Sequence, residues 1–239
     1  MNCVLKFENL KISMNNKVLL DNFNLSVNEG DRYMLMGENG AGKSLLLELI
    51  ALGFSKDLTT RYKGLKIEGK ILDAKGNNLL NPKTNRQISY VSQEESFYNN
   101  STIYDEALSA CNGMGIDLNE EKLDKLLTTF EINHKKKQKI KNNISFGEGK
   151  IVHLITRILK LENANILLLD EPLNHLSFKN SKKFNDIILE EIEKNPKLTI
   201  IMISHCRAIN FINKAIKYKS ENKNYEQIKY RAYDCFDVE

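Results

Sequence analysis

The residues Gly37-Glu38-Asn39-Gly40-Ala41-Gly42-Lys43-Ser44 decide how this chain folds. They follow a short apolar run at positions 33–36 and lead into the mostly apolar run 45–50. This order predicts a buried strand, a glycine-rich turn and a helix whose first N–H groups face a phosphate chain. In this pattern the Lys43 ammonium reaches the β- and γ-phosphates, and the Ser44 hydroxyl ligates Mg²⁺. We therefore expect a nucleotide with Mg²⁺ as the ligand.

A second apolar run, residues 166–169, ends in two carboxylates, Asp170 and Glu171. Four consecutive apolar residues are typical of a strand buried on both faces. Asp170 stands at the end of this strand, where it can hold Mg²⁺ directly or through water. Glu171 can accept the proton of an attacking water. The alternative is a strand that ends in a solvated acidic turn.

A third apolar run, residues 199–203, ends in Ser204 and His205. A lone histidine at a strand end is more often structural than catalytic. Here we expect the strand to lie beside the phosphate-binding loop, because parallel strands end at one edge of a sheet. In that position the His205 imidazole can contact a γ-phosphate or the attacking water.

Composition narrows the class of protein. The 239 residues are 41% hydrophobic and 28% charged with a net charge of +4, which is ordinary for a globular chain of one large domain or a core with an insertion. We interpret the lysines at 135–137 as a solvated face rather than a nucleic-acid patch. Apolar runs are too short to cross a bilayer, so any membrane span must belong to another chain. The N-terminus shows no signal pattern, and the scattered cysteines are typical of reduced thiols in a cytosolic protein: Cys3, Cys111, Cys206 and Cys235.

Strand-like and helix-like segments alternate along most of the chain, which predicts a parallel sheet covered by helices on both faces. Between residues 101 and 141 the pattern is helical only, with Thr102 as a cap and an apolar face over 120–130. This segment is the candidate for an inserted helical subdomain. The expected elements are short strands within 3–36, strands at 65–67, 70–72, 88–91, 166–169 and 198–203, helices at 43–52, 103–111, 120–130, 148–161, 179–194 and 207–213, and a hairpin after residue 215.

The order of the motifs resembles that of the ATP-binding-cassette (ABC) ATPases. Besides the phosphate-binding loop, the segment 88–94 resembles the Q-loop, 143–148 the signature motif written LSGGQ, 173–177 the D-loop, and 204–205 the H-loop. The resemblance implies an α/β fold, namely a P-loop NTPase with a RecA-like core, an N-terminal antiparallel β-subdomain and an inserted α-helical subdomain. It implies a single ABC ATPase domain over residues 1–239, with the catalytic core at 1–95 and 145–239 and the helical subdomain at 96–144.

The same resemblance implies a role for each site residue. In the family, two such domains face head to tail, and each ATP lies between one phosphate-binding loop and the opposite signature motif. The implied catalytic residues are Glu171, His205, Gln93 and Lys43, and the implied Mg²⁺ ligands are Ser44, Gln93 and Asp170. The implied ATP contacts are Met14, Asn39, Gly40, Ala41, Gly42, Lys43, Ser44, Leu45, Ser145, Gly147 and Glu148.

Several positions depart from the family pattern. Met14 stands where an aromatic residue stacks on adenine, and a thioether packs on a base less strongly. Phe146 replaces the first glycine of the signature motif. Glu148 replaces its glutamine, as in the translation-factor branch of the family, which the segment 174–176 also resembles. The segment 149–151 lacks the Gln-Arg pair that often follows the signature motif.

The resemblance implies an ATP hydrolase, and the leading hypothesis is the ATP-hydrolysing subunit of a transporter. The single cassette, the spacing between Gln93 and Ser145 and the lack of an appended domain favour it. Its membrane-spanning subunits are expected to be separate chains, contacted by residues from about Gln93 to Tyr104. The partner cassette is a second copy or a related chain. The expected location is cytoplasmic, peripheral at the inner face of the cell membrane.

Two other functions remain open. The first is a soluble, non-transport ABC ATPase acting on ribosomes, nucleic acid or a protein assembly, which Glu148 and the segment 174–176 favour. Against it, the chain shows neither the paired cassettes of the translation factors nor a long coiled-coil insertion, and we expect no direct contact with nucleic acid. The second is a nucleotide switch with little turnover, which Phe146 and Met14 favour and Glu171 opposes.

Overall fold

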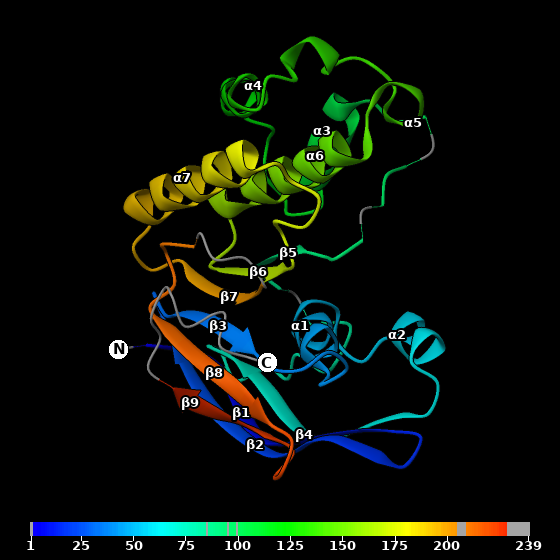
Figure 1. The fold of residues 1–239 in the computed structure, drawn as a ribbon, viewed down its shortest axis with the longest axis vertical. Helices are drawn as coiled ribbons and strands as arrows, with labels where there is room; N and C mark the ends of the chain where they lie inside the picture. Colours follow the sequence, from blue (N-terminus) through cyan, green and yellow to red (C-terminus); the bar gives the residue numbers. More distant parts are fainter. Residues whose placement is uncertain (1, 85, 95, 99, 205–208, 229–239) are drawn as a thin grey trace.

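The computed structural model describes residues 2–84, 86–94, 96–98, 100–204 and 209–228. A six-stranded sheet in the order β5-β6-β7-β3-β8-β9 crosses the middle of the molecule (Figure 1). Its first five strands in that order are parallel, and β9 pairs antiparallel with β8 at one edge. The strands are β3 (Arg32–Met36), β5 (Ile88–Val91), β6 (Ile166–Asp170), β7 (Thr199–Ile203), β8 (Lys214–Lys219) and β9 (Asn224–Ile228).

A smaller antiparallel sheet, in the order β2-β1-β4, lies on one side of the large sheet (Figure 1). The strands β1 (Cys3–Met14) and β2 (Lys17–Asn28) join through Asn15 and Asn16, both with positive φ, as a tight hairpin turn requires. The two strands expected at 65–67 and 70–72 are one strand, β4 (Leu65–Asp73). A bulge explains the interrupted pattern, because Gly69 with φ 87° lies against the Asn9 backbone where the register shifts.

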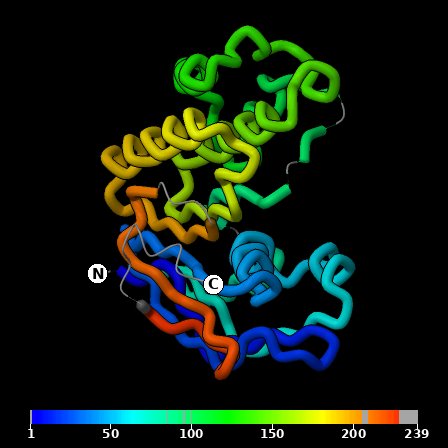
Figure 2. The backbone as a smooth tube through the Cα atoms, in the orientation of Figure 1, coloured from blue at the N-terminus to red at the C-terminus, as the bar shows by residue number. Residues whose placement is uncertain are grey.

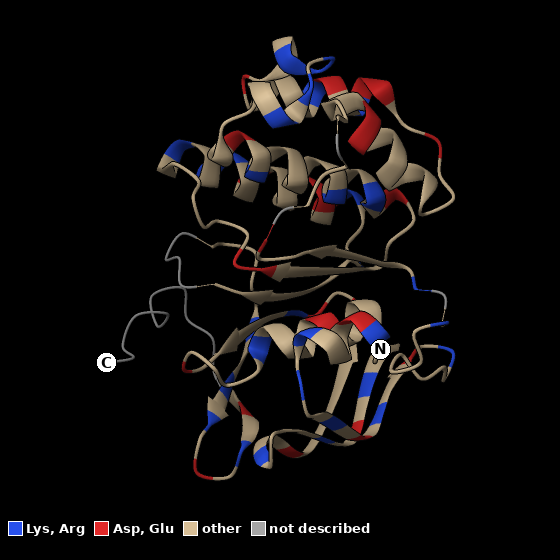
Figure 3. Cartoon of the chain, turned by 90° about the vertical axis from the view of Figure 1, so that its right-hand side faces the viewer, with Lys and Arg blue, Asp and Glu red and all other residues tan. Residues whose placement is uncertain are grey.

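Both faces of the large sheet are buried, which accounts for the unbroken apolar strands. In β6, Leu167 and Leu169 face one core while Ile166 and Leu168 face the other. The first core packs against α6 (Phe146–Leu159) and α7 (Phe178–Lys194). The second core includes α1 (Lys43–Leu52) and the small sheet. The central strands therefore carry few charged residues (Figure 3).

The helical subdomain extends from the α6–α7 layer, on the side away from the large sheet (Figure 2). Its members are α3 (Ile103–Asn112), α4 (Glu120–Thr129), the short η1 (Asn133–Lys135) and α5 (Ile140–Asn143). Thr102 caps α3 as predicted and forms a capping box with Asp105. Leu123, Leu126 and Leu127 of α4 are buried, also as predicted.

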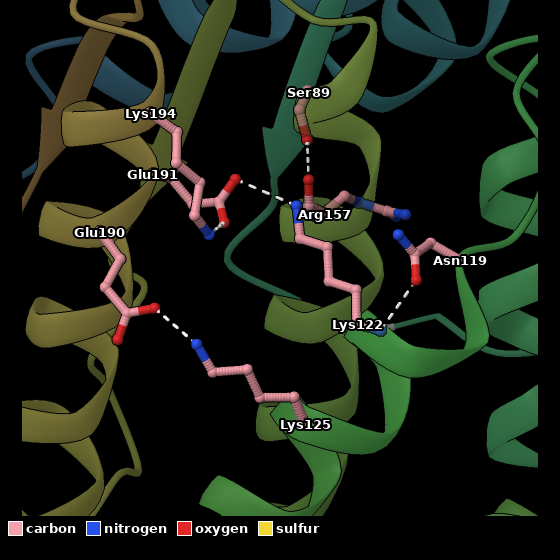
Figure 4. Close-up of polar contacts among 8 residues, drawn as sticks. All are labelled: Ser89, Asn119, Lys122, Lys125, Arg157, Glu190, Glu191 and Lys194. Carbon is pink, nitrogen blue, oxygen red and sulfur yellow. Dashed lines mark hydrogen bonds and ion pairs between the residues drawn. The ribbon is translucent and has the colours of Figure 1, made fainter.

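Ion pairs join this subdomain to α7. Lys122 pairs with Glu191 at 3.0 Å and Lys125 with Glu190 at 2.9 Å (Figure 4). Two of the lysines predicted to form a solvated face are also paired, Lys135 with Glu148 and Lys136 with Asp124. Their charges are therefore partly satisfied within the chain.

Three further segments differ from the sequence-based expectations. The short helix α2 (Lys56–Arg61), capped by Ser55, lies in a stretch for which only strands were expected. Helix α6 begins at Phe146 rather than 148, and η2 (Lys160–Glu162) follows it. The helix expected at 207–213 is wrong over its described part, because residues 209–213 are irregular with a bend at Phe211, and Ile209, Phe211 and Ile212 are buried. The Asn213 N–H donates to the Arg32 carbonyl, which holds this segment along β3.

No helix in the described part of the chain is long and apolar enough to cross a membrane.

Candidate active site

A cavity of about 510 Å³ lies at the carboxyl ends of β6 and β7, beside the glycine-rich turn after β3. Its lining combines regions that are distant in the sequence. Ten of the expected site residues line it: Met14, Asn39, Gly40, Gly42, Lys43, Ser44, Leu45, Gln93, Asp170 and Glu171. Leu19, Tyr62, Asn174 and Ile203 complete the wall. Ala41, also expected here, is buried and does not line the cavity.

The loop before α1 has the conformation that the sequence predicts. Gly40 and Gly42 have φ near 80°, a region that residues with a Cβ rarely adopt. Gly42 is the N-cap of α1, and no side chain caps the helix. The first N–H groups of α1 therefore face the cavity without a side-chain acceptor, which suits an anionic ligand. The Lys43 Nζ donates to the carbonyls of Gly37 at 2.6 Å and Glu38 at 2.8 Å.

Ser44 and Asp170 meet at one end of the cavity. The Ser44 hydroxyl donates to Asp170 Oδ1 at 3.1 Å. Burial raises the pKa of Asp170 to about 6, and the Ser44 hydrogen bond opposes that rise. A hydroxyl and a carboxylate are hard oxygen ligands of the kind that Mg²⁺ takes when phosphates supply the rest of its shell. The described residues contain no cluster of three or more His, Cys, Asp or Glu side chains that could hold a metal alone. The donor set thus fits Mg²⁺ brought with a nucleotide.

Glu171 lies beside Lys43. Burial lowers the pKa of Lys43, and the Glu171 carboxylate is the largest opposing influence, followed by Asp170 and Glu38. Glu171 is 7% exposed and has a positive φ of 47°. Its N–H donates to the carbonyl of Ile203 at the end of β7. This bond holds the carboxylate at the junction of two strands, next to the phosphate-binding loop.

The other side of the cavity is apolar and partly aromatic. Met14 ends β1 and Leu19 lies early in β2, so the small sheet supplies this wall. Tyr62, just after α2, also lines the cavity, and burial together with the nearby Glu48 carboxylate raises its pKa to about 12. Sequence reasoning missed Leu19 and Tyr62. An aromatic residue outside any motif carries no signal, because its place depends on how α2 packs.

The signature-like turn is not part of this cavity. Ser145 caps α6 and forms a capping box in which its hydroxyl and N–H both donate to Glu148 Oε2 at 2.9 Å. Lys135 donates to both Glu148 oxygens at 2.8 Å, which lowers the pKa of Glu148. Ser145, Gly147 and Glu148 are thus held together at one helix start, apart from the other expected nucleotide contacts.

A contact with His175 explains in part why Phe146 can stand where the motif has glycine. Its ring packs edge-on against His175 with 4.7 Å between centroids, yet its side chain remains 64% exposed. His175 has a positive φ, and its carbonyl lies 3.3 Å from where a Cβ on Gly147 would stand. The segments expected as D-loop and signature motif therefore lie side by side in one chain. His205, expected to be catalytic, lies outside the described residues, although β7 leads directly toward the cavity.

Comparisons with known proteins show which family the chain is similar to. The family model described as "ABC transporter" matches residues 20–174. The ergothioneine transport ATP-binding protein EgtV of Helicobacter pylori (strain G27) is 30% identical over 84% of this chain and 90% of that protein. The ATP-binding protein Uup of Buchnera aphidicola subsp. Acyrthosiphon pisum (strain APS) is 29% identical over 84% of this chain but only 30% of its own length. The structure of an ATP-binding subunit of an ABC transporter shares the fold, with a TM-score of 0.78 at 20% identity, over 95% of this chain and 90% of that chain.

Proposed function

Because the chain belongs to the ABC transporter family of ATP-binding proteins and is an ATPase, we propose that it powers a transporter whose membrane-spanning subunits are separate chains. The matched region covers 90% of the transport protein EgtV but 30% of Uup. The similarity therefore extends over most of a transport ATP-binding protein, which favours this function. The proposal places it in the cytoplasm, at the inner face of the membrane, through its partners.

A second ABC domain is part of this proposal. The observation that carries it is the separation of the two halves of the expected site, since Ser145 and Gly147 do not line the cavity that holds Lys43 and Glu171. Two copies in head-to-tail contact would bring the α6 start of one copy over the phosphate-binding loop of the other. The exposed rings of Phe146 and Phe178, 64% and 79% exposed, lie at the starts of α6 and α7 and would be covered in such a pair.

Within one copy, the residues divide the chemistry. The loop N–H groups and the Lys43 ammonium bind the phosphates, and charge that develops on them during cleavage is stabilised by the same donors. Bound Mg²⁺ would neutralise phosphate charge, held by Ser44, Asp170 and Gln93. Glu171 accepts the proton of the attacking water, and His205 is proposed to contact the γ-phosphate from the end of β7.

The test of this site is the substitution Glu171→Gln. It keeps the shape of the side chain and removes the proton acceptor, so ATP hydrolysis should fall by about 10²- to 10⁴-fold. ATP binding persists, and the chain should elute as a dimer with Mg-ATP and as a monomer with ADP. Glu190→Gln, an exposed carboxylate on α7, is the matched control and should leave both measurements unchanged. A Glu171→Gln protein that stays monomeric with saturating Mg-ATP would exclude the composite site.

The proposed contact with the membrane subunits is the loop after Gln93 and the cleft beside it. This cleft of about 410 Å³ lies between α3 and α6, and Tyr98 at its edge is 70% exposed. Its lining includes Ser96, Phe97, Tyr98, Glu106, Arg157 and Lys160. An exposed tyrosine beside a polar cleft is typical of an interface anchor. Tyr98→Ala should leave the ATPase activity of the isolated chain intact and abolish co-purification with an integral membrane protein.

A soluble ABC ATPase is the second candidate. Glu148 and the segment 174–176 favour it, and Uup is among the similar proteins. Co-sedimentation with ribosomes, or salt-sensitive binding to nucleic acid, would establish this function in place of the first.

A further inference from the structure

One face of α6 carries three basic or titratable residues, Lys150, His153 and Arg157. They are spaced three and four residues apart, so they form one stripe along the helix. All three contact β5 or the loop that follows it. The sequence motifs do not call for any of them, and the site described above does not use them.

Lys150 is the most unusual of the three. It is fully buried, and its Nζ donates to the carbonyls of Ser92 at 3.3 Å and Gln93 at 3.2 Å. Burial of an ammonium group is unfavourable unless polar groups replace its water. Here the backbone of the Gln93 loop supplies part of that replacement.

The other two residues fix the segment just before this loop. Arg157 Nε donates to the Tyr90 carbonyl at 2.8 Å, and the Ser89 hydroxyl donates to the Arg157 carbonyl at 2.8 Å (Figure 4). His153 Nε2 lies 3.4 Å from the Ser92 hydroxyl. Burial lowers the pKa of His153 to about 3, so its ring is neutral at physiological pH. Along this stripe, Lys150 alone of the three bonds to Gln93 itself.

We propose that Lys150 is a positioning residue for Gln93 and joins it to the start of α6. Gln93 lines the nucleotide cavity with its side chain exposed, and its backbone carbonyl is held by Lys150. Lys150 stands five residues after Ser145 on the same helix. When a bound ligand displaces Gln93, Lys150 therefore transmits the movement to the start of α6. This helix start is the part of the chain that faces the site of the opposite copy. One side chain ties the two halves of the composite site.

The electrostatics agree with this placement. The Lys150 charge also acts on the Asp170 carboxylate and lowers its pKa, against the larger effect of burial. The ammonium is thus close enough to Asp170, at the proposed Mg²⁺ end of the cavity, to affect its charge. A methionine at position 150 would fill a similar volume but would leave both loop carbonyls without this donor.

This inference rests on the role proposed for Gln93, so the experiment measures that role separately. ATPase kinetics would be compared for the purified full chain, Gln93→Ala, Lys150→Met and the double variant. Lys150→Gln keeps an N–H donor for the carbonyls. Lys122→Met is the matched control, because Lys122 is largely buried but bonds to Glu191, far from the loop. Thermal unfolding of every variant accompanies the kinetics.

We expect Lys150→Met to lower kcat about 10- to 100-fold while KM for ATP changes less than about threefold. The double variant should be no slower than Gln93→Ala alone, because both changes act on one group. Lys150→Gln should recover most of the lost kcat, and Lys122→Met should change stability only. If Lys150→Met does not fold, Lys150→Ala, which also lacks the donor, takes its place in the cycle.

Two results would overturn the inference. One is a set of additive effects in the double variant, which would mean that Lys150 acts apart from Gln93. The other is a loss of kcat that is equal in Lys150→Met and Lys150→Gln and is proportional to their loss of thermal stability. That result would mean that Lys150 has a structural role only. A wild-type rate in Gln93→Ala would instead refute the role proposed for Gln93.

Discussion

Lys160 gives the sharpest stability prediction, because its charge is unfavourable in the folded chain. It follows the last turn of α6 and lines the cleft beside Tyr98. Its ammonium forms no hydrogen bond or ion pair with any residue that the structure describes. Burial lowers its pKa from 10.5 to about 8, and the nearby Arg157 charge adds to this effect. We predict that Lys160→Met stabilises the chain at neutral pH.

The size and pH window follow from the two pKa values. The folded pKa lies below the unfolded one, so the unfolded chain binds more protons between pH 8 and 10.5, and wild-type stability rises with pH across that window. Below pH 8 the penalty is fully present. At 1.36 kcal/mol per pKa unit it amounts to about 3 kcal/mol. Partial exposure and the favourable helix C-terminus reduce the expected gain to about 1–2 kcal/mol, or roughly 2–6 °C in Tm.

The assay is urea unfolding of wild type and Lys160→Met at pH 7 and pH 10. Taking the difference between the two proteins at each pH largely cancels the other titrating groups. The stabilisation at pH 10 should be about a quarter of that at pH 7, since wild-type Lys160 is then mostly neutral when folded. Lys137→Met, at an exposed lysine, is the control and should change stability by less than about 0.5 kcal/mol. Equal stabilisation at both pH values, or none at either, would refute the reasoning.

Two further predictions concern the nucleotide site, and a third concerns the cap of α6. Ser44→Ala should raise the Mg²⁺ concentration that gives half-maximal ATPase activity by about tenfold, because it removes one of the proposed oxygen ligands. The measurement is a Mg²⁺ titration at fixed ATP, and an unchanged titration would exclude Ser44 as a ligand. Met14→Tyr should tighten ATP binding by about 2- to 10-fold, because an aromatic ring stacks on the base better than a thioether does. Calorimetry measures this affinity, and weaker binding would show that the base does not lie against β1. Glu148→Gln keeps the cap of α6 but loses the charge that pairs with Lys135. The pKa of Glu148 is lowered in the folded chain, so its contribution is present above pH 4.5 and lost as pH falls through the folded value; the variant should be less stable at pH 7, with the difference disappearing at low pH in thermal melts.

The sequence predicted most reliably what is local. The glycine-rich loop, the strand before it and the helix after it are fixed by neighbouring residues, and so is the acidic end of β6. The meeting of Ser44 with Asp170 also followed, because parallel strands end at one edge. These local patterns identified most of the cavity.

What the sequence could not predict depends on contacts between distant segments. Tyr62 reaches the cavity only because α2 packs beside α1. The segment 209–213 has apolar residues at spacings that fit a helix, but it forms no helix, and Asn213 at its end bonds to Arg32 of β3 instead. Lys150 looks like an ordinary polar residue of an amphipathic helix. Its complete burial follows from the Gln93 loop lying across it, which no local pattern encodes.

The cap of α6 has a consequence for how two copies would meet. Ser145 already donates its hydroxyl to Glu148, and Lys135 compensates the charge of that carboxylate. In the proposed pair, the triphosphate bound by a second copy would take over this donor, so the phosphate and the Glu148 carboxylate would compete for one proton. Association would then be an exchange of acceptors rather than a simple addition of contacts. The ATP concentration at which two copies associate should accordingly depend on the strength of the ion pair between Lys135 and the displaced Glu148 carboxylate. Salt that weakens this ion pair would change that ATP concentration.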